Sequence, residues 1–499
     1  MGQKSVIIVG AGIAGLSAGC YAAMNGYRPE IFEMHTAPGG LCTAWKRGGY
    51  TVDGCVHWLV GSKPGSAMYR VWEELGAVQG RRFLYADDFL RYEASNGEVF
   101  TLHCDLEKLE QHMLEISPED SPATRRFCKA AREFAATGIP VLKPMALMGP
   151  WDKVKMAIEL RRLRPYLIWN RRSMSEVLRE FKSPLIRKAI SHAWPESFPA
   201  GFLFSTLAWM NDSSAGYPLG GSLEFSKSIE KRYIGLGGEV RYGCKVEKIL
   251  VEGDRAVGVR LEDGSEHRAD CVVSAADGHA TIFDWLEGKY VDETIRGYYE
   301  KLPLFPSLVL VALGVNRRFD DVPVLVSSLH IELPEPLRLA NCTLSSLSLR
   351  IFNNDPTLAP EGRTTLLSMF ASECAWWKNI GQDASRYCQV KTEVADRTIA
   401  ALDRRFPGLA AQVEMRDVAT PLTIERYTGN WKGSFEGWMT TPQTWMLRMR
   451  NTLPGLCNFW MCGQWVEPGG GLPPAALSGR NVVQFLCAQD GKKFVTAAP

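Results

Sequence analysis

The 499-residue chain lacks cysteine pairs at metal or redox spacing and carries little net charge. Its thirteen cysteines form no C-x-x-C and no Cys/His cluster, which argues against structural zinc and favours a reducing, cytoplasmic setting. None of the eight histidines belongs to an H-E-x-x-H pattern, so we expect no bound metal. A formal net charge of +2 gives no strong attraction to nucleic acid, and no such partner is expected.

Long apolar segments are scarce as well. Residues 5–24 form an uncharged stretch long enough to span a bilayer, but several glycines interrupt it. A membrane span or signal segment is the less favoured interpretation, because the glycines have a better explanation below and no targeting sequence is evident. With 46% hydrophobic and 22% charged residues, the composition is that of a soluble globular protein of two or three domains.

The amino terminus has the pattern of a nucleotide-binding βαβ unit. A β-branched apolar run at residues 5–9 leads into G-x-G-x-x-G, and a helix of small residues is expected over about residues 12–25. In this motif Gly10 permits a tight turn, Gly12 lets the backbone approach a pyrophosphate, and Gly15 allows close packing of helix and strand.

The start of this helix and the end of the next strand complete the predicted dinucleotide site. The first turn, with Ile13 and Ala14, offers N–H groups and partial positive charge to phosphates. The second strand ends near Glu33, where a carboxylate can accept hydrogen bonds from a ribose and disfavours a 2′-phosphate. A purely structural βαβ unit is the alternative, but strand, glycines, helix, strand and acid all occur in order.

A second glycine cluster lies near the carboxy terminus. Residues 463–480, GQWVEPGGGLPPAALSGR, place three consecutive glycines ahead of an alanine-rich helix. Glycine loses more conformational freedom on folding than other residues, so such a cluster needs a function. A glycine-rich loop at a helix N-terminus presents backbone N–H groups to an anionic ligand. We expect Gly470, Gly471 and Leu472 to lie against such a ligand.

Several segments resemble one flavoprotein family. Glu33 begins an E-x-x-x-x-P-G-G pattern, a modified G-Y-x-x-D-x-G pattern follows, and residues 353–367 and 427–438 match further segments. Together they resemble the phytoene desaturase and carotenoid isomerase branch of the flavin amine-oxidase superfamily. The resemblance covers nearly the whole chain and is most specific at its two ends.

The resemblance implies FAD as the cofactor. It implies that the double-glycine loop, with Gly39, Gly40, Leu41 and Thr43, passes close to the FAD diphosphate and flavin. It also implies that the main chain near Val246 faces the adenine end of FAD. Relatives often carry Arg where this chain has Leu41.

At the carboxy-terminal end, the resemblance places the flavin pyrimidine edge against residues 470–472. The helix dipole there would stabilise the negative charge of a reduced flavin. Many relatives have Gly-Asp for the ribityl chain, where this chain has Gly463 and Gln464. Because glutamine still hydrogen-bonds a hydroxyl, we expect altered binding of the ribityl chain and not its loss.

The expected fold class is α/β, with a discontinuous Rossmann-like FAD-binding domain and a substrate-binding domain that has a mixed sheet and a helical cap. The FAD-binding domain is predicted to comprise residues 1–75, 215–290 and 440–499. The substrate-binding domain is predicted to comprise residues 76–214 and 291–440, with core strands near 305–315 and 364–372. Sequence leaves the oligomeric state open.

The predicted cap, residues 141–190, is strongly basic. It holds twelve Lys and Arg against four Asp and Glu, interleaved with apolar and aromatic residues such as Tyr166 and Trp169. Ser173 and Glu176 have the spacing of a capping box that opens a helix. A basic amphipathic segment suits peripheral contact with an anionic membrane, and a solvated helical face is an equally good interpretation.

The resemblance implies a desaturase, isomerase or saturase that uses flavin N5 to act on C–C or C=C bonds of a long apolar substrate. That substrate would be a carotenoid, another polyisoprenoid or a fatty-acyl chain, held in an apolar tunnel with few polar groups. A flavin amine oxidase and a non-catalytic carrier of lipid or prenyl groups are alternatives on the same fold. A yellow purified protein would exclude the carrier.

Two side chains are candidates for proton handling. His57 follows the flavin-side loop, and Glu467 lies just before the triple glycine. Either group could serve as acid or base if it lies close to flavin N5. A structural histidine and a surface loop acid are the respective alternatives. Trp45, Trp58 and Trp465 flank these loops and could line the channel or pack in the core.

Overall fold

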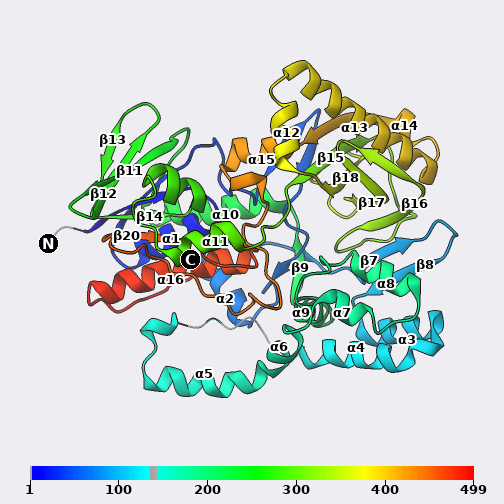
Figure 1. The fold of residues 1–499 in the computed structure, drawn as a ribbon, viewed down its shortest axis with the longest axis horizontal. Coiled ribbons are helices and arrows are strands. Elements are labelled where there is room, and N and C mark those ends of the chain that lie inside the picture. Colours follow the sequence, from blue (N-terminus) through cyan, green and yellow to red (C-terminus); the bar gives the residue numbers. More distant parts are fainter. Residues whose placement is uncertain (1–2, 135–140, 142) are drawn as a thin grey trace.

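The computed structural model describes residues 3–134, 141 and 143–499, with the side chains at 157 and 159–162 outside the described part. The fold is α/β, with a parallel sheet on one side of the molecule, a larger mixed sheet on the other and helices around both (Figure 1). This agrees with the predicted fold class. The predicted domain boundaries remain a prediction.

The first sheet combines strands from distant parts of the chain. Its five strands are parallel, with Val6 opposite Cys271 and Val272 opposite Phe459. Their buried, β-branched sequences are typical of strands covered on both faces. In spatial order the strands are β10 (Glu239–Arg241), β2 (Arg28–Phe32), β1 (Ser5–Val9), β14 (Cys271–Ser274) and β20 (Phe459–Met461).

Glycines allow the first helix to pack closely on this sheet and on its neighbours. Helix α1 (Ile13–Met24) contacts α10 (Gly221–Gly235) and α16 (Leu472–Gln489). A Cβ on Gly15 would lie 1.9 Å from the carbonyl oxygen of Gly10, and one on Gly479 would lie 2.3 Å from that of Ala14. The amino-terminal β1–α1 unit and the carboxy-terminal helix α16 therefore pack closely against each other.

Smaller sheets connect the parallel sheet with the rest of the molecule. An antiparallel sheet contains β11 (Val246–Glu252), β12 (Arg255–Leu261) and β13 (Glu266–Arg268). A hairpin follows the double-glycine loop, and a second three-stranded sheet follows the hairpin. These contain β3 (Ala44–Arg47) and β4 (Tyr50–Asp53), then β5 (Leu59–Val60), β9 (Ala215–Pro218) and β6 (Phe83–Leu84).

The second large sheet has seven strands and lies on the other side of the molecule (Figure 1). The predicted core strands form β15 and β18, which pair antiparallel along their whole length. One pair, β16 with β7, is parallel. In spatial order the strands are β19 (Val413–Ala419), β15 (Leu308–Val315), β18 (Thr364–Ala371), β17 (Cys342–Ile351), β16 (Leu329–Leu339), β7 (Asp88–Glu93) and β8 (Val99–His103).

Helices surround the mixed sheet and join it to the parallel sheet. Those after β18 include α12 (Cys374–Ile380), α13 (Ala384–Arg405), α14 (Leu409–Gln412) and α15 (Pro421–Thr428). The others are α2 (Ala67–Glu74), α3 (Leu106–Ile116), η1 (Pro118–Asp120), α4 (Ser121–Phe134), α9 (Ala200–Asn211), η3 (Ala280–Trp285), α11 (Glu293–Lys301) and η4 (Trp431–Gly433).

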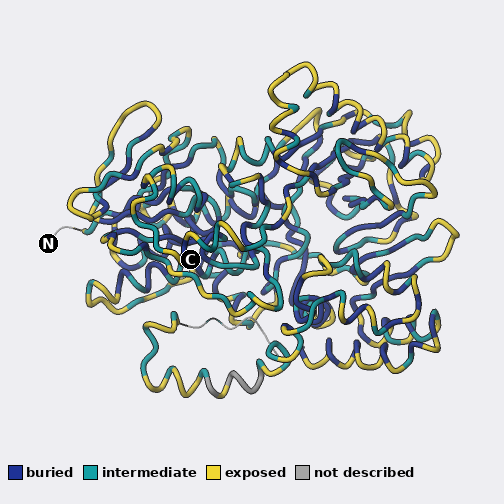
Figure 2. Tube along the Cα trace, viewed as in Figure 1, coloured by how far each residue is buried: buried dark blue, intermediate teal, exposed yellow. Residues whose placement is uncertain are grey.

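The basic stretch is helical. It contains η2 (Met145–Leu147), α5 (Pro150–Arg162), α6 (Arg164–Trp169), α7 (Met174–Leu178) and α8 (Pro184–Ser191). The predicted capping box is present, with Ser173 Oγ accepting from the Glu176 N–H and Glu176 accepting from the Ser173 N–H at 2.7 Å. Helix α5 lies at the edge of the molecule (Figure 1), and those of its residues whose burial is described are largely exposed (Figure 2).

Within the described residues, no helix is long and apolar enough to cross a bilayer. The uncharged stretch at residues 5–24 forms strand β1 of the parallel sheet and helix α1, which packs on that sheet. The membrane-span interpretation of this segment is therefore wrong. Its glycines serve close packing, as at Gly15.

Candidate active site

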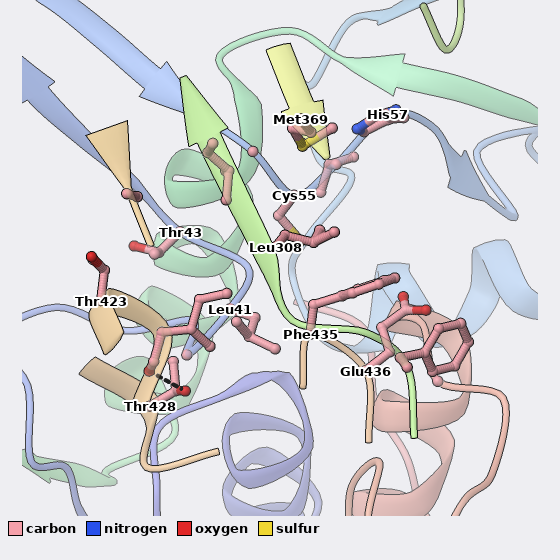
Figure 3. A pocket seen from close by; sticks show the side chains of 18 of the residues that line it. Leu41, Thr43, Cys55, His57, Leu308, Met369, Thr423, Thr428, Phe435 and Glu436 are labelled. Carbon is pink, nitrogen blue, oxygen red and sulfur yellow. Dashed lines mark hydrogen bonds between the residues drawn. The ribbon is translucent and has the colours of Figure 1, made fainter. Parts of the chain in front are cut away.

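A cavity of about 1170 Å³ lies between the two glycine loops and the seven-stranded sheet. Sites for a single small ligand measure about 300–1,000 Å³, so this cavity has room for a cofactor and a substrate. Figure 3 shows side chains from the double-glycine loop, from β15 and β18, from α15 and from the segment before the tail loop converging on it.

The head of the chain contributes two glycine segments that touch. Gly12 and Gly39 form an isolated parallel bridge, and the Gly39 N–H donates to the carbonyl oxygen of Ala11 at 2.9 Å. Gly39 and Gly40 both have positive φ, which favours glycine there. A Cβ on Gly12 would meet no atom nearer than 3.9 Å. Gly40, which borders the cavity, lies next to Gly12, because a Cβ on Gly40 would be 3.5 Å from the Gly12 Cα.

The tail loop borders the same cavity. Its glycines, residues 469–471, all have positive φ, and α16 begins directly after them with no side-chain cap. The N–H of Gly463 donates to Ser478 Oγ at 2.7 Å, and a Cβ on Gly463 would contact the Ala14 side chain at 3.4 Å. The two glycine clusters thus lie together, although they stand at opposite ends of the sequence.

Glu33 lies at one end of the cavity. Its carboxylate accepts hydrogen bonds from the N–H groups of Ala11 at 2.7 Å and His35 at 2.8 Å, while burial raises its pKa. Its carbonyl oxygen accepts from the N–H of Cys244 at 2.8 Å, two residues before Val246. The start of β11 is therefore held against the residue that was predicted to bind a ribose.

The predicted cofactor residues divide into two groups. Those that border the cavity are Glu33, Gly40, Leu41, Thr43, Gly470, Gly471 and Leu472. Those that lie behind this wall or beside it are Gly10, Gly12, Ile13, Ala14, Gly15, Gly39, Val246, Gly463 and Gln464. Their individual contacts with a cofactor remain predictions.

The residues present fit FAD. Two helix N-termini without side-chain caps, those of α1 and α16, flank the glycine loops, and such ends attract phosphate or another anionic group. A buried carboxylate, Glu33, stands at the position after β2 where dinucleotide folds place the ribose acceptor. The positive-φ glycines keep Cβ atoms away from the space between them.

His57 borders the cavity in a loop that a buried aspartate braces (Figure 3). Asp53 accepts hydrogen bonds from the N–H and the Oγ of Ser222, both at 2.6 Å, and Arg350 donates to the carbonyl oxygen of Val56 at 3.0 Å. Burial, assisted by the charge of Arg350, lowers the pKa of His57 well below its usual range. The imidazole is therefore neutral near pH 7.

Glu436 is a cavity acid that the sequence analysis missed. Its carboxyl group points into the cavity beside Phe435 (Figure 3), and a Cβ on Gly470 would lie 2.7 Å from the Glu436 Cβ. Burial raises the pKa of Glu436 to about 8. The sequence feature that could have indicated it is that Glu436 is the one acid in the glycine-rich segment 427–438. The resemblance of this segment to the family points to no single side chain.

Glu467, the acid chosen from the sequence, does not border the cavity. Its N–H donates to the carbonyl oxygen of Gly463 at 3.2 Å, and burial raises its pKa while Arg448 opposes the shift. Its predicted catalytic role gains no support from this position. Trp465 is also outside the cavity and packs against Trp438 with ring centroids 5.3 Å apart, which is core packing.

The cavity wall is mostly aromatic and aliphatic. Its large apolar members include Trp45, Trp58, Trp194, Phe202, Trp209, Phe305, Leu308, Leu310, Met369 and Phe435. The end next to β16 and β17 is polar instead, with His192, Ser327, Ser328, His330 and Ser348. A second polar and charged set borders the cavity beside β19 and α15, with Arg47, Lys391, Asp417, Thr423, Arg426 and Thr428. These polar groups differ from the expected tunnel of few polar groups. They were not anticipated because most of them belong to the middle of the chain, where the resemblance to the family is least specific.

Comparison with known proteins identifies the family. The model of the family described as flavin containing amine oxidoreductase matches residues 13–486, nearly the whole chain. The chain belongs to this family. Membership confirms the expected family, fold class, FAD cofactor and enzyme class. The fit of the glycine loops to FAD agrees with this membership.

Similar proteins include carotenoid enzymes. Prolycopene isomerase of Daucus carota is 25% identical over 98% of this chain and 81% of the relative. Phytoene desaturase (neurosporene-forming) of Rhodobacter capsulatus is 25% identical over 97% of this chain and 94% of the relative. A solved putrescine oxidase variant shares the fold, with a TM-score of 0.63 at 14% identity over 98% of this chain and 99% of that one.

Proposed function

We propose that this flavoenzyme acts on C–C or C=C bonds of a long apolar substrate, carotenoid, polyisoprenoid or fatty-acyl, as a desaturase, isomerase or saturase. The observation that carries the proposal is the aromatic and aliphatic wall of the cavity, which runs on directly from the two glycine loops. The names of the curated relatives support it. Amine oxidation is less favoured, because those relatives act on carotenoids by name.

The residues proposed to hold FAD are those of the two glycine clusters and Glu33. The N-terminus of α1 would take the diphosphate, Glu33 a ribose, and the N-terminus of α16 the negatively charged edge of the flavin. When bound, FAD supplies hydride acceptance or hydride return. The chain itself supplies orientation, exclusion of water and a proton carrier.

The proposed proton carrier is Glu436. A desaturation removes a proton from the carbon next to the one that loses hydride, and an ionised carboxylate accepts that proton at an oxygen atom. The reverse reaction takes a proton from the neutral carboxyl group. A pKa of about 8, which burial brings about, makes both forms accessible near neutral pH. His57 borders the same cavity as a neutral imidazole that can hydrogen-bond but carries no charge.

Anaerobic mixing of the FAD-loaded protein with candidate polyenes and fatty acids tests this proposal. Flavin colour and product mass are followed together, in normal water and in D₂O. We expect one of three outcomes: oxidised FAD bleaches while the substrate loses two hydrogens, FAD reduced beforehand with dithionite is reoxidised while the substrate gains two, or the product has unchanged mass. Anaerobic bleaching by amines, with peroxide release once air is admitted, and no reaction with any apolar chain would overturn the proposal in favour of amine oxidation.

We also propose that α5 and η2 contact an anionic membrane surface. Large apolar side chains are exposed there, with Trp151 80%, Val154 50% and Ile158 59% exposed at the spacing of one helix face. Lys153 and Lys155 lie on the same helix and are exposed. An exposed apolar stripe with lysines beside it suits insertion into anionic headgroups, from which an apolar substrate is drawn. Arg161 and Arg162, which belong to the predicted basic cap, lie outside the described side chains.

A further inference from the structure

We propose that the cavity end formed by β16, β17 and the residues after α8 binds an uncharged oxygen atom of the substrate, a hydroxyl or carbonyl group. The inference rests on the proposed function, because it specifies which polar group the apolar chain carries. Five polar side chains border this end, here called the polar end: His192, Ser327, Ser328, His330 and Ser348.

Three members of the polar end form a directed hydrogen-bond chain. Ser348 Oγ donates to Ser328 Oγ at 3.1 Å, and Ser328 Oγ lies 2.9 Å from His330 Nε2. Because Ser328 accepts from Ser348, its own hydrogen is free to go to His330 Nε2. Ser348 then has lone pairs that accept, and the Ser327 hydroxyl, which has no protein partner within the described part of the chain, donates or accepts.

Ring stacking holds the polar end rigid. Tyr92 stacks on His192 with centroids 5.4 Å apart, and His192 stacks on His330 at 4.3 Å. The backbone register places His330 between Tyr92 on β7 and Ser348 on β17. Side chains held in this way lose little further freedom when a ligand binds, which favours binding of a well-placed polar group.

The polar end offers no cation to a carboxylate. Burial lowers the pKa of His192 and, more strongly, that of His330, so both rings are neutral near pH 7. Arg350 lies two residues beyond Ser348, but its guanidinium is buried, donates to the carbonyl oxygen of Val56 and does not border the cavity. An ionised group here would lose hydration without a counter-charge, whereas a neutral oxygen would replace its water hydrogen bonds.

The position of the polar end suits a substrate that spans the cavity. β16, β7 and α8 lie on the side of the molecule away from α1 and α16 (Figure 1), which carry the glycine loops. Trp58, Trp194 and Phe305 border the same cavity, as do Glu436 and the tail loop. A long chain whose oxygen is held at β16 and β17 can therefore extend along these apolar side chains, so that its double bonds or methylene groups reach Glu436 and the tail loop.

Binding measurements on the FAD-loaded protein test the inference. The probes are polyenes of one chain length that end in a methyl group, a primary alcohol, an aldehyde or a carboxylate, and quenching of tryptophan fluorescence reports Kd. One well-placed hydrogen bond corresponds to about three- to tenfold in affinity. We expect the alcohol and the aldehyde to bind at least about threefold more tightly than the methyl compound and the carboxylate.

A matched set of variants locates the effect. Ser327→Ala combined with Ser348→Ala removes the free donor and the free acceptor and should abolish the preference for the alcohol and aldehyde, while the exposed Ser345→Ala on the same strand as Ser348 should keep it. Equal affinities in the native protein, tightest binding of the carboxylate, or an unchanged preference in the double variant would overturn the inference. Turnover of the methyl compound separates the two proposals. If the enzyme converts this compound, the proposed function stands, even if the polar end binds no oxygen atom.

Discussion

Glu436 lies directly against Gly470: a Cβ on this glycine would stand only 2.7 Å from the Cβ of Glu436. Gly470 has φ of +62° and sits in the loop before α16, so its lack of a side chain serves both its conformation and this contact. The contact places an acid with a raised pKa beside the loop that is proposed to hold the flavin edge. The first two predictions concern this acid.

Glu436→Gln should reduce turnover by about 10²- to 10⁴-fold, the usual contribution of a general acid or base. In the native enzyme, burial sets the pKa of Glu436 to about 8, so a desaturation rate should rise with pH through about 8 as the carboxylate forms. A reaction that adds a proton should instead lose rate through the same range. Glu436→Gln should retain FAD but lose this change of rate with pH near 8. A pH–rate profile that the substitution leaves unchanged would exclude Glu436 as the proton carrier.

The same substitution should stabilise the protein at high pH. The pKa of Glu436 rises on folding from 4.5 to about 8, so between these values the unfolded chain releases a proton that the native state keeps. Native stability therefore falls as pH rises through this window and is level above it. The Tm of Glu436→Gln should exceed that of the native protein by several degrees at pH 8 and match it near pH 4.5. Glu361→Gln, at an exposed position, is the control and should show no such pH dependence.

Gly479→Ala should unfold or strongly destabilise the chain. Its Cβ would lie 2.3 Å from the Ala14 carbonyl oxygen and 2.8 Å from the Ala18 nitrogen, which are backbone atoms of α1 that cannot turn aside. We expect a loss of roughly 3 kcal/mol or more in the free energy of unfolding. Gly235→Ala at the end of α10, where a Cβ meets nothing within 4 Å, should be neutral or slightly stabilising in the same urea titration.

Trp151→Ser should weaken binding to vesicles that contain anionic lipid. Trp151 is 80% exposed on α5, so its replacement removes apolar contact with the lipid without disturbing the core. Flotation should show binding of the native protein to anionic vesicles and a clear decrease for the variant. Ile234→Ser, at an exposed apolar position on α10, should bind like the native protein. Absence of the native protein from both anionic and neutral vesicles would remove the membrane proposal.

The sequence predicted the parts of the fold that local rules determine. The glycine pattern at Gly10 and Gly15, the strand–helix–strand order and the capping box at Ser173 follow from backbone geometry within a few residues, and all are present. The core strands β15 and β18 were evident from their apolar runs. A strand as short as β13, with three residues, carries too little pattern to be predicted from the sequence.

The candidate site was predicted only in part, because it depends on long-range contacts. Glu436 and Glu467 look alike in sequence, each being an acid near glycines, and only the folded chain puts the former in the cavity. The polar end joins His192 to β16 and β17, more than a hundred residues away, through ring stacking that no local pattern encodes.

The flavin content of Gly12→Ala, measured together with its thermal stability, shows whether the amino-terminal glycine cluster holds FAD. Within the protein a Cβ on Gly12 is an ordinary contact, 3.9 Å from the Gly39 carbonyl oxygen, whereas one on Gly15 would lie 1.9 Å from that of Gly10. Gly15→Ala should therefore disrupt folding itself, and Gly12→Ala should harm only a ligand that touches the backbone. We expect native protein to bind one FAD per chain, and we expect Gly12→Ala to keep the Tm of the FAD-free native protein within about 3 °C but to lose bound FAD. A Gly12→Ala protein that retains FAD fully, or a native protein that binds none at saturating FAD, would contradict this expectation.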